Sequence, residues 1–239
     1  MSELYNKTLQ RLVKYRHIQQ MTQIDMGNWF GITQSHYSKM ELGRIEIPYK
    51  FLCKLYAGNW DIDYLVTGIY NGAQEHMLDG LFRSCREQDR YELMKLALWL
   101  IDQVIDRSKD HTSVLERRIL HMLLEGGPVS SVMYLIRNVI DFSQVIMAER
   151  LGLGMKKYRR MEKGDTQPDL ELLTIVYHLS GCRPSLFLGS EEGAFVILKS
   201  LWNCIDKDFQ YHLLPFLEFG RTIIEIENES SNSRCVDVK

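Results

Sequence analysis

The segment "FGITQSHYSKMELGR", residues 30–44, has the pattern of a short helix with two different faces. Tyr37 and Met40 are three residues apart, so a helix places both on one apolar face. Gly31 and Gly43 stand near the two ends, where glycine lets the chain turn at low cost. The other face carries amide, hydroxyl, imidazole and ammonium groups, contributed by Gln34, Ser35, His36, Ser38 and Lys39. The segment therefore predicts a helix that packs on one side and offers hydrogen-bonding groups on the other.

The preceding residues predict a partner for this helix. Residues 22–43 fit two helices joined by a tight turn at Gly31, with the small residue Gly27 where the two helices cross. In a helix-turn-helix, the second helix enters the DNA major groove and its N-terminal residues meet base edges. Amides, hydroxyls and cations are the groups that read those edges. The polar face of residues 33–41 therefore favours DNA recognition.

The same pattern occurs a second time in the chain, 121 residues later. Without a gap, residues 21–68 align with residues 142–189, with 11 identities in 48 positions. The identities include both turn glycines, Gly31 with Gly152 and Gly43 with Gly164. Because the glycines and the apolar spacing agree together, the match indicates an internal duplication. The segments that follow each copy are more weakly alike.

The chain as a whole has helical periodicity, and no alternating strand pattern is convincing. The sequence predicts an all-α protein. The helices of the first copy and its extension are expected at residues 3–17, 22–29, 33–41, 48–57, 61–67, 74–86 and 89–108. Those of the second are expected at 114–125, 130–140, 143–150, 154–162, 169–179, 184–188, 191–204 and 207–227. Thr22, Thr33 and Ser143 are predicted N-caps.

Composition is that of an ordinary globular protein, and the charge is uneven along the chain. The net charge is −2, with 45% hydrophobic and 25% charged residues. Residues 1–70 and residues 132–190 each hold 8 Lys and Arg against 6 Asp and Glu, so both copies are mildly basic. The stretch "GMKKYRRMEKG", residues 154–164, is the most basic part of the second copy.

Several protein classes lack support in the sequence. The five cysteines are scattered and form no C-x-x-C pair, which favours reduced thiols and a cytoplasmic protein. No signal peptide is visible, and the longest apolar run is too short to span a bilayer. No catalytic motif, metal-ligand spacing or cofactor fingerprint is present, so we expect no enzyme, no metal site and no cofactor.

Both copies resemble one known family. Residues 12–68 and 133–189 are similar to the Cro/repressor-type (XRE-family) helix-turn-helix domain, and together they cover about half of the chain. The shared pattern is [ST]-Q, a small residue, a turn glycine, an aromatic or aliphatic residue, [MI]-E-x-G and L-x-x-G. The second copy departs from it at Gly154, where a capping Ser or Thr is common. The resemblance implies lambda-repressor-like domains that read operator DNA, and hence a transcriptional regulator, most simply a repressor.

The resemblance also implies DNA-contacting residues. Gln23 matches the glutamine that opens the first helix of the motif, and Arg44 follows the motif, where it would meet phosphate. The base-reading positions and their neighbours in the first copy are Gln34, Ser35, His36, Ser38 and Lys39. The matching residues of the second copy are Gln144, Met155, Lys156, Lys157, Arg159 and Arg160. We expect the first copy to read mixed sequence and the second to supply more of the electrostatic affinity.

Other interpretations of these residues stay open. His36 and the "KKYRR" run are also compatible with solvated surface. Tyr37 and Tyr158 fit the core better than base stacking, and Glu41 and Glu162 fit hydrogen bonding inside the domain. Some helix-turn-helix domains bind proteins, so an antitoxin-like or antirepressor-like interaction module is the alternative function.

The predicted organisation has two DNA-binding domains, each with a helical extension. The boundaries are 1–70 for the first domain, 71–110 for its extension, 111–190 for the second domain, 191–227 for a C-terminal extension and 228–239 for a disordered tail. Apolar stripes on the helices at 89–108 and 207–227 are compatible with packing of each helix on its own domain, but favour dimerisation or packing of the two halves on each other. An intrachain pseudo-dimer and a homodimer are both compatible with double-stranded operator DNA as the partner, and no membrane partner is expected.

Overall fold

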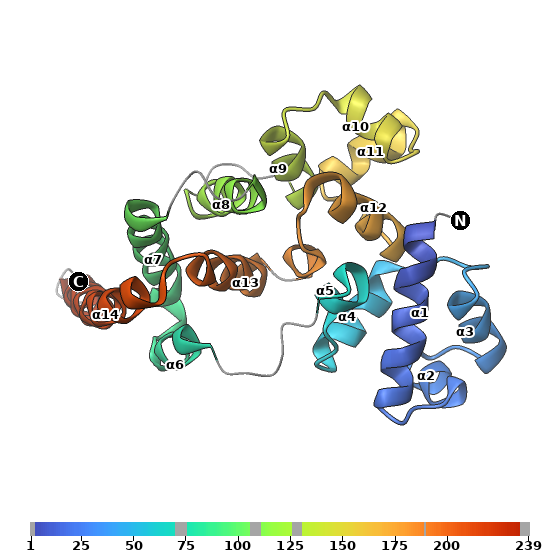
Figure 1. Cartoon of the computed structure of the whole chain (residues 1–239), viewed down its shortest axis with the longest axis horizontal. Coiled ribbons are helices and arrows are strands. Elements are labelled where there is room, and N and C mark those ends of the chain that lie inside the picture. The colour runs from blue at the N-terminus through green and yellow to red at the C-terminus, as the bar shows by residue number, and fades with distance from the viewer. Residues whose placement is uncertain (1–2, 70–75, 106–110, 126–130, 189, 235–239) are drawn as a thin grey trace. The chain divides into compact units, whose positions relative to one another are not determined.

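The computed structural model describes residues 3–69, 76–105, 111–125, 131–188 and 190–234 (Figure 1). All regular secondary structure in these residues is helical, which confirms the predicted all-α class. The predicted and observed helix boundaries differ by only a few residues at most positions. None of the helices in the described residues is long and apolar enough to cross a membrane.

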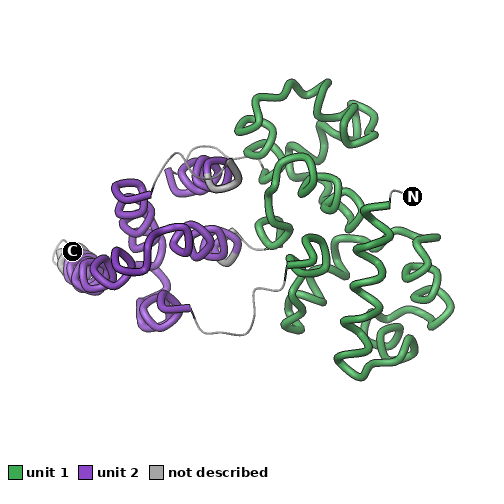
Figure 2. The backbone as a smooth tube through the Cα atoms, in the orientation of Figure 1, with its two compact units in different colours: residues 1–72, 129–190 green, residues 73–128, 191–239 purple. Residues whose placement is uncertain are grey.

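The chain forms two compact units, and each is assembled from two separate stretches (Figure 2). Unit 1 contains residues 1–72 and 129–190, and unit 2 contains residues 73–128 and 191–239. Unit 1 therefore contains both copies of the repeated segment, and unit 2 contains the segments that follow each copy.

In unit 1 the two copies have the same order of elements. The first copy has α1 (Glu3–Ile18), α2 (Gln23–Phe30), α3 (Gln34–Glu41), α4 (Tyr49–Ala57) and α5 (Ile62–Thr67). The second has α9 (Val132–Val139), α10 (Gln144–Arg150), α11 (Met155–Glu162), α12 (Leu170–Ser180) and the 3-10 helix η2 (Pro184–Phe187). The starts of α10, α11 and α12 lie 121 residues after those of α2, α3 and α4. η2 lies where the sequence predicts a helix at 184–188.

The copies pack against each other inside unit 1. α1 contacts α12, and the hydroxyl oxygens of Thr8 and Thr174 lie 3.3 Å apart with both residues fully buried. The backbone N–H of Leu170 donates to the carbonyl of Ile47 over 3.0 Å. Because these bonds join segments more than a hundred residues apart, the two copies form one continuous core.

A buried carboxylate fixes a second part of this contact. Asp63, on α5, is 4% exposed. It accepts hydrogen bonds from the backbone N–H and the hydroxyl of Ser185, on η2, each over 2.8 Å. Burial raises the pKa of Asp63, although both bonds to Ser185 oppose that rise.

Unit 2 is built around a pair of long helices. Its elements are α6 (Met77–Ser84), η1 (Glu87–Asp89), α7 (Arg90–Val104), α8 (His111–Leu124), α13 (Ser190–Asn203) and α14 (Lys207–Arg234). α7 packs along α14, and Gly220 allows a close approach, because a Cβ there would lie 2.1 Å from Leu96 Cδ2. The two apolar stripes identified in the sequence are thus partly buried against each other.

Two features differ from the predicted organisation. The tail predicted to be disordered at 228–239 is helical as far as Arg234, and residues 235–239 lie outside the described part. The helix continues because Asn228 donates to buried Asp89 and Arg86 pairs with Glu229 at 2.9 Å, and extending a formed helix costs little. Residues 111–125 group with unit 2 rather than with 131–190, since α8 packs on α7.

Candidate nucleic-acid interface

Local sequence determines where α2 and α3 begin and end. Thr22 caps α2 by accepting a hydrogen bond from the N–H of Asp25, and the Asp25 carboxylate accepts one from the N–H of Thr22. Gly31 ends α2 with a φ of +74°, a conformation that side chains disfavour. Thr33 then caps α3 by accepting from the N–H of His36. The predicted caps at Thr22 and Thr33 are confirmed, as is the cap of Ser143 on α10.

The two helices of the pair are in close contact. A Cβ on Gly27 would lie 2.9 Å from the carbonyl oxygen of Ile32, so this position of α2 has no room for a side chain. Tyr37 and Met40 of α3 are 0% and 2% exposed and face the core. Burial raises the pKa of Tyr37, which keeps its phenol neutral. The interpretation of Tyr37 as a core residue is confirmed.

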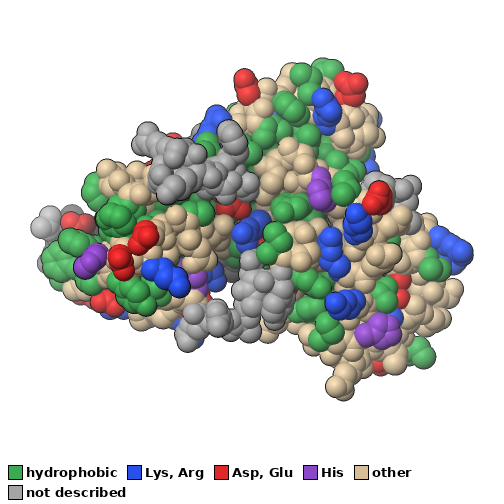
Figure 3. Space-filling view, in the orientation of Figure 1, with side chains coloured by type: hydrophobic (Ala, Val, Ile, Leu, Met, Phe, Trp, Pro, Cys, Tyr) green, Lys and Arg blue, Asp and Glu red, His purple; other side chains and the backbone are tan. Residues whose placement is uncertain are grey.

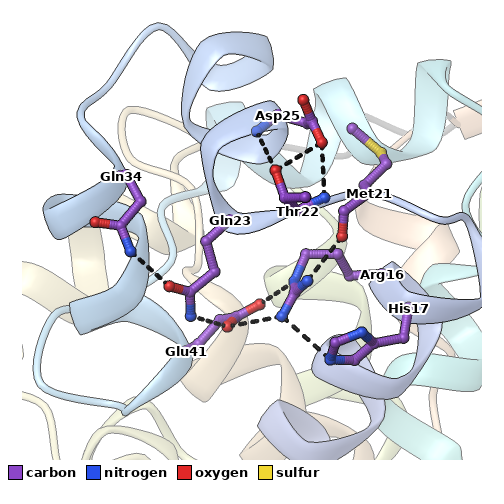
Figure 4. Close-up of polar contacts among 8 residues, drawn as sticks. All are labelled: Arg16, His17, Met21, Thr22, Gln23, Asp25, Gln34 and Glu41. Carbon is purple, nitrogen blue, oxygen red and sulfur yellow. Dashed lines mark hydrogen bonds and ion pairs between the residues drawn. The ribbon is translucent and has the colours of Figure 1, made fainter.

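A chain of polar contacts connects this core to the surface of α3 (Figure 4). Arg16 Nε of α1 donates to Glu41 Oε1 over 2.7 Å, and the two side chains are only 6% and 5% exposed. Gln23 Nε2 donates to Glu41 Oε2 over 2.7 Å, and Gln34 Nε2 donates to Gln23 Oε1 over 2.7 Å. Arg16 also donates to the carbonyl of Met21. The charges at the base of the chain are therefore neutralised, and the amides at its outer end are held in one orientation.

The second copy has the same arrangement at positions 121 residues later. Arg137 Nε donates to Glu162 Oε1 over 2.5 Å, and Gln144 Nε2 donates to the other oxygen of Glu162. Arg137 also donates to the carbonyl of Phe142, as Arg16 does to Met21. The outer end differs, because Arg159 Nε donates to Gln144 Oε1 over 3.4 Å, whereas Gln34 is the donor to Gln23 in the first copy.

Electrostatics stabilise each buried ion pair. Burial by itself would lower the pKa of Arg16, but the hydrogen bond and charge of Glu41 raise it. The same causes act on Arg137 beside Glu162. Both guanidinium groups thus stay charged, and the expectation that Glu41 and Glu162 accept hydrogen bonds inside the domain is confirmed.

Most residues predicted to contact DNA lie on α3 and α11, whereas Gln23 and Gln144 begin α2 and α10 and Arg44 follows α3. Gln34, Ser35, His36, Lys39 and Arg44 are exposed, and Gln23 and Ser38 are half-buried. In the second copy, the exposed members are Lys156, Lys157, Arg159 and Arg160, and the half-buried ones are Gln144 and Met155. Figure 1 shows the pairs α2–α3 and α10–α11 at two separate places on the periphery of unit 1.

The cations of these helices are available for a ligand. Within the described part of the chain, the side chains of Lys39, Lys156, Lys157 and Arg160 form no ion pair or hydrogen bond. Figure 3 shows Lys and Arg side chains spread over the visible face of unit 1. Such groups attract a polyanion at little desolvation cost, since their charge is not used inside the fold.

Sequence reasoning missed the two arginines that hold the network. Arg16 and Arg137 also stand 121 residues apart, but the gap-free alignment begins after them, at residue 21. Extending the alignment by five residues toward the N-terminus would have identified them.

Exposed apolar side chains next to each pair were also missed. In the first copy Ile24 is 60% exposed and Leu42 is 55% exposed, and Val145 of the second copy is 61% exposed. Such side chains can contact sugar rings and thymine methyl groups, or an apolar surface of a protein.

No metal cluster of three or more His, Cys, Asp or Glu residues occurs in the described ranges. No protein-family model, curated protein or solved structure matches this chain.

Proposed function

We propose that the protein is a sequence-specific DNA-binding regulator of transcription, most simply a repressor, in which α3 and α11 enter the major groove of operator DNA. The observation that carries this proposal is the repeated Arg–Glu–Gln network, which holds the exposed polar helix of each pair on a buried base. A base-reading helix needs such support, because its side chains must meet base edges in one orientation.

The two helices offer different chemistry to DNA. The Gln34 amide can pair with adenine N6 and N7, and Ser35 and Lys39 lie beside it on the exposed surface. One N–H of Gln34 Nε2 can stay bonded to Gln23, because the amide keeps a second N–H and its carbonyl oxygen for the base edge. α11 instead carries Lys157 and Arg160, which reach phosphates or guanine edges. On this proposal α3 provides more of the specificity and α11 more of the electrostatic affinity.

The resemblance of both copies to Cro/repressor-type domains supports an internal duplication with DNA-reading function. Since the two copies share one core in unit 1, one chain would hold two reading helices in a defined relation, as a pseudo-dimer. Such a chain would recognise two non-identical half-sites, because α3 and α11 differ at nearly every outward position.

A protein-binding module is the second candidate. The exposed Ile24, Leu42, Val145 and Ile146 beside the two pairs favour it, since apolar groups at this place would suit a protein surface. In that case one or both pairs would bind a protein, as an antitoxin-like or antirepressor-like partner does.

Selection from random-sequence duplexes, run at two salt concentrations, tests the proposal. We expect a two-part motif from the intact chain, with loss of specificity at one or two base pairs in Gln34→Ala. Gln103→Ala, on exposed α7 surface of unit 2, is the matched control and should recover the original motif. Sequence-blind binding that disappears at moderate salt would overturn the proposal and favour the protein-binding module.

A further inference from the structure

α14 has two apolar faces, and among the described residues of unit 2 one of them is packed while the other is largely exposed. The used face packs on α7 and includes Leu217, which is fully buried, and Gln210, which is 7% exposed. Gln210 Nε2 donates to the carbonyls of Trp202 and Ile205 over 3.0 and 2.8 Å. Toward its C-terminal end, Asn228 donates to Asp89. This face therefore accounts for how α14 is attached to its own unit.

A second row of side chains runs along another side of the same helix. The row, named here the α14 seam, consists of Phe209, His212, Phe216, Phe219, Ile223 and Ile226. Successive members are three, four, three, four and three residues apart, which is the a/d spacing of a coiled coil. At 100° per residue this row is centred about 140° around the helix from Gln210, Leu217 and Asn228. The centre of the seam is therefore on another side of α14 from Leu217, and Gly220, which faces Leu96 of α7, lies between the two, about 70° from the centre of the seam.

The seam is exposed to an unusual degree. Phe209 is 53%, Phe216 is 64%, Phe219 is 67% and Ile226 is 53% exposed. Figure 3 shows hydrophobic side chains gathered on the surface over α14. Soluble proteins rarely leave a contiguous row of aromatic and β-branched side chains in water. A covering surface is therefore expected.

We propose that the α14 seam binds the α14 seam of a second copy of this chain as a parallel two-stranded coiled coil. The seam keeps its alternating three- and four-residue spacing over about two and a half heptads, so a partner helix must have the same spacing to pack along it. α14 of a second copy has the identical spacing. No member of the seam is Asp, Glu, Lys or Arg, so pairing the seam with itself brings no like fixed charges together. Pro215 lies beside the seam and not within it.

Charges on the flanks favour the parallel orientation. In a parallel pair the charged flanking residues are Asp208, which meets Leu213, and Glu227, which meets Thr222 of the second copy, and neither pair is like-charged. An antiparallel pair that aligns the seams would place Asp208 opposite Glu229. The parallel pair avoids that repulsion.

The exposed phenylalanines of the seam supply roughly half of the area that a stable dimer interface needs. A whole aromatic side chain has about 150–250 Å² to bury, so the three phenylalanines alone contribute on the order of 300–450 Å² per copy. A stable interface needs about 800 Å² per partner. The two isoleucines and the aliphatic parts of the flanking residues add to the phenylalanine area.

Molar mass in solution tests this inference, using sedimentation of the full chain at micromolar concentration. We expect twice the chain mass of 28.1 kDa for the intact protein. The double variant Phe216→Glu/Phe219→Glu should raise the dimer dissociation constant at least about 100-fold and sediment as a monomer. Tyr211→Glu is the matched control, because Tyr211 is 67% exposed on the same helix but outside the seam, and it should remain dimeric.

Orientation is tested by oxidation of a Phe216→Cys variant in a Cys204→Ser background, since Cys204 is exposed. A parallel pair brings the two introduced thiols together, so a disulfide between them is expected. A monomeric intact protein, or a seam variant that stays dimeric, would overturn the inference. The inference does not depend on DNA binding, so the failure of DNA binding would leave the mass measurement unaffected.

Discussion

At the scale of single residues, the molecule depends on two buried ion pairs that link its core to its surface. Arg16 and Glu41 have side chains 6% and 5% exposed. Removing one partner of such a pair leaves the other charge buried, which costs far more than loss of a surface pair. These residues are therefore structural, although they stand within the segment that resembles a DNA-binding motif.

Glu41→Gln is expected to lower the free energy of unfolding by about 3–5 kcal/mol, because Arg16 keeps its charge without a neutralising partner. Denaturant unfolding followed by circular dichroism measures it. Glu3→Gln is the control, since it removes a pair with Lys7 that lies at the surface, and no measurable change is expected. Equal small effects for both variants would show that the Arg16–Glu41 pair does not anchor the fold.

Asp63 gives a pH-dependent contribution to the stability of unit 1. Its pKa is raised by burial above the ordinary 3.8, so the folded chain holds this proton more tightly than the unfolded chain. The stability that protonation contributes is complete below about 3.8 and is lost as pH rises through the raised pKa. Relative to Asp63→Asn, the intact protein should gain stability as pH falls from neutral toward 4.

Unfolding curves of the two proteins across that pH range measure the difference. Ser185→Ala removes one hydrogen bond that opposes the rise in the pKa of Asp63. The pKa should therefore rise further, and stability should change with pH over a wider pH range. A stability difference that stays constant with pH would mean that the Asp63 carboxyl is not desolvated in the folded protein.

At the scale of elements, the helix boundaries were predictable because their signals are local. Capping residues and glycines with positive φ terminate α2, α3 and α10 where the sequence predicts. The C-terminal part of α14 could not be predicted, because its side-chain contacts with Asp89 and Arg86 are distant in sequence. The grouping of α8 with α7 depends on contacts between consecutive helices, such as His121 with Asp102, which periodicity does not identify.

The site was predictable to a similar degree. The outward residues of α3 could be located from helical periodicity, and the resemblance to Cro/repressor-type domains pointed to Gln23, Arg44 and the residues of the second copy. Which of them are held in place could not be predicted, because Gln23 and Arg16 both donate to Glu41 and these bonds join three helices. The role of Gln23 as a link in this network follows only from the structure.

The contact between α2 and α3 provides a test with a built-in comparison. Gly27→Ala should destabilise the protein by about 1–3 kcal/mol, because the new Cβ would lie 2.9 Å from the carbonyl oxygen of Ile32. The equivalent position in the second copy already holds a side chain, Ala148, which is 2% exposed. Ala148→Gly should cost about 1 kcal/mol through helix propensity and reduced burial. Thermal unfolding compares the two, and a neutral Gly27→Ala would contradict the described packing of α2 on α3.

The unequal charge of α3 and α11 leads to a prediction about salt. The triple variant Lys156→Gln/Lys157→Gln/Arg160→Gln should reduce the slope of log binding constant against log salt. The reduction should be about 0.9 for each phosphate that the variant no longer neutralises, up to about 2.7. Lys39→Gln in α3 should reduce the slope by at most about 0.9. Fluorescence anisotropy titrations at several salt concentrations give the slopes. An unchanged slope in the triple variant would contradict the assignment of electrostatic affinity to α11.

At the scale of the whole molecule, the central claim is that one chain carries two DNA-reading helices. The two copies share a core through α1 and α12 and through Asp63 and Ser185, so their relation is fixed by unit 1 and not by a linker. Dimerisation through α14, as inferred above, would bring four such helices together.

Hydroxyl-radical footprinting on a selected duplex tests this claim most directly. The intact chain should protect two separate stretches of the backbone. Gln34→Ala/Lys39→Ala in α3 should weaken one stretch, and Lys157→Gln/Arg160→Gln in α11 should weaken the other. If both variants weakened the same stretch, or if the α11 variant left the footprint unchanged, only one helix pair would contact DNA. The claim that one chain carries two DNA-reading helices would then be wrong.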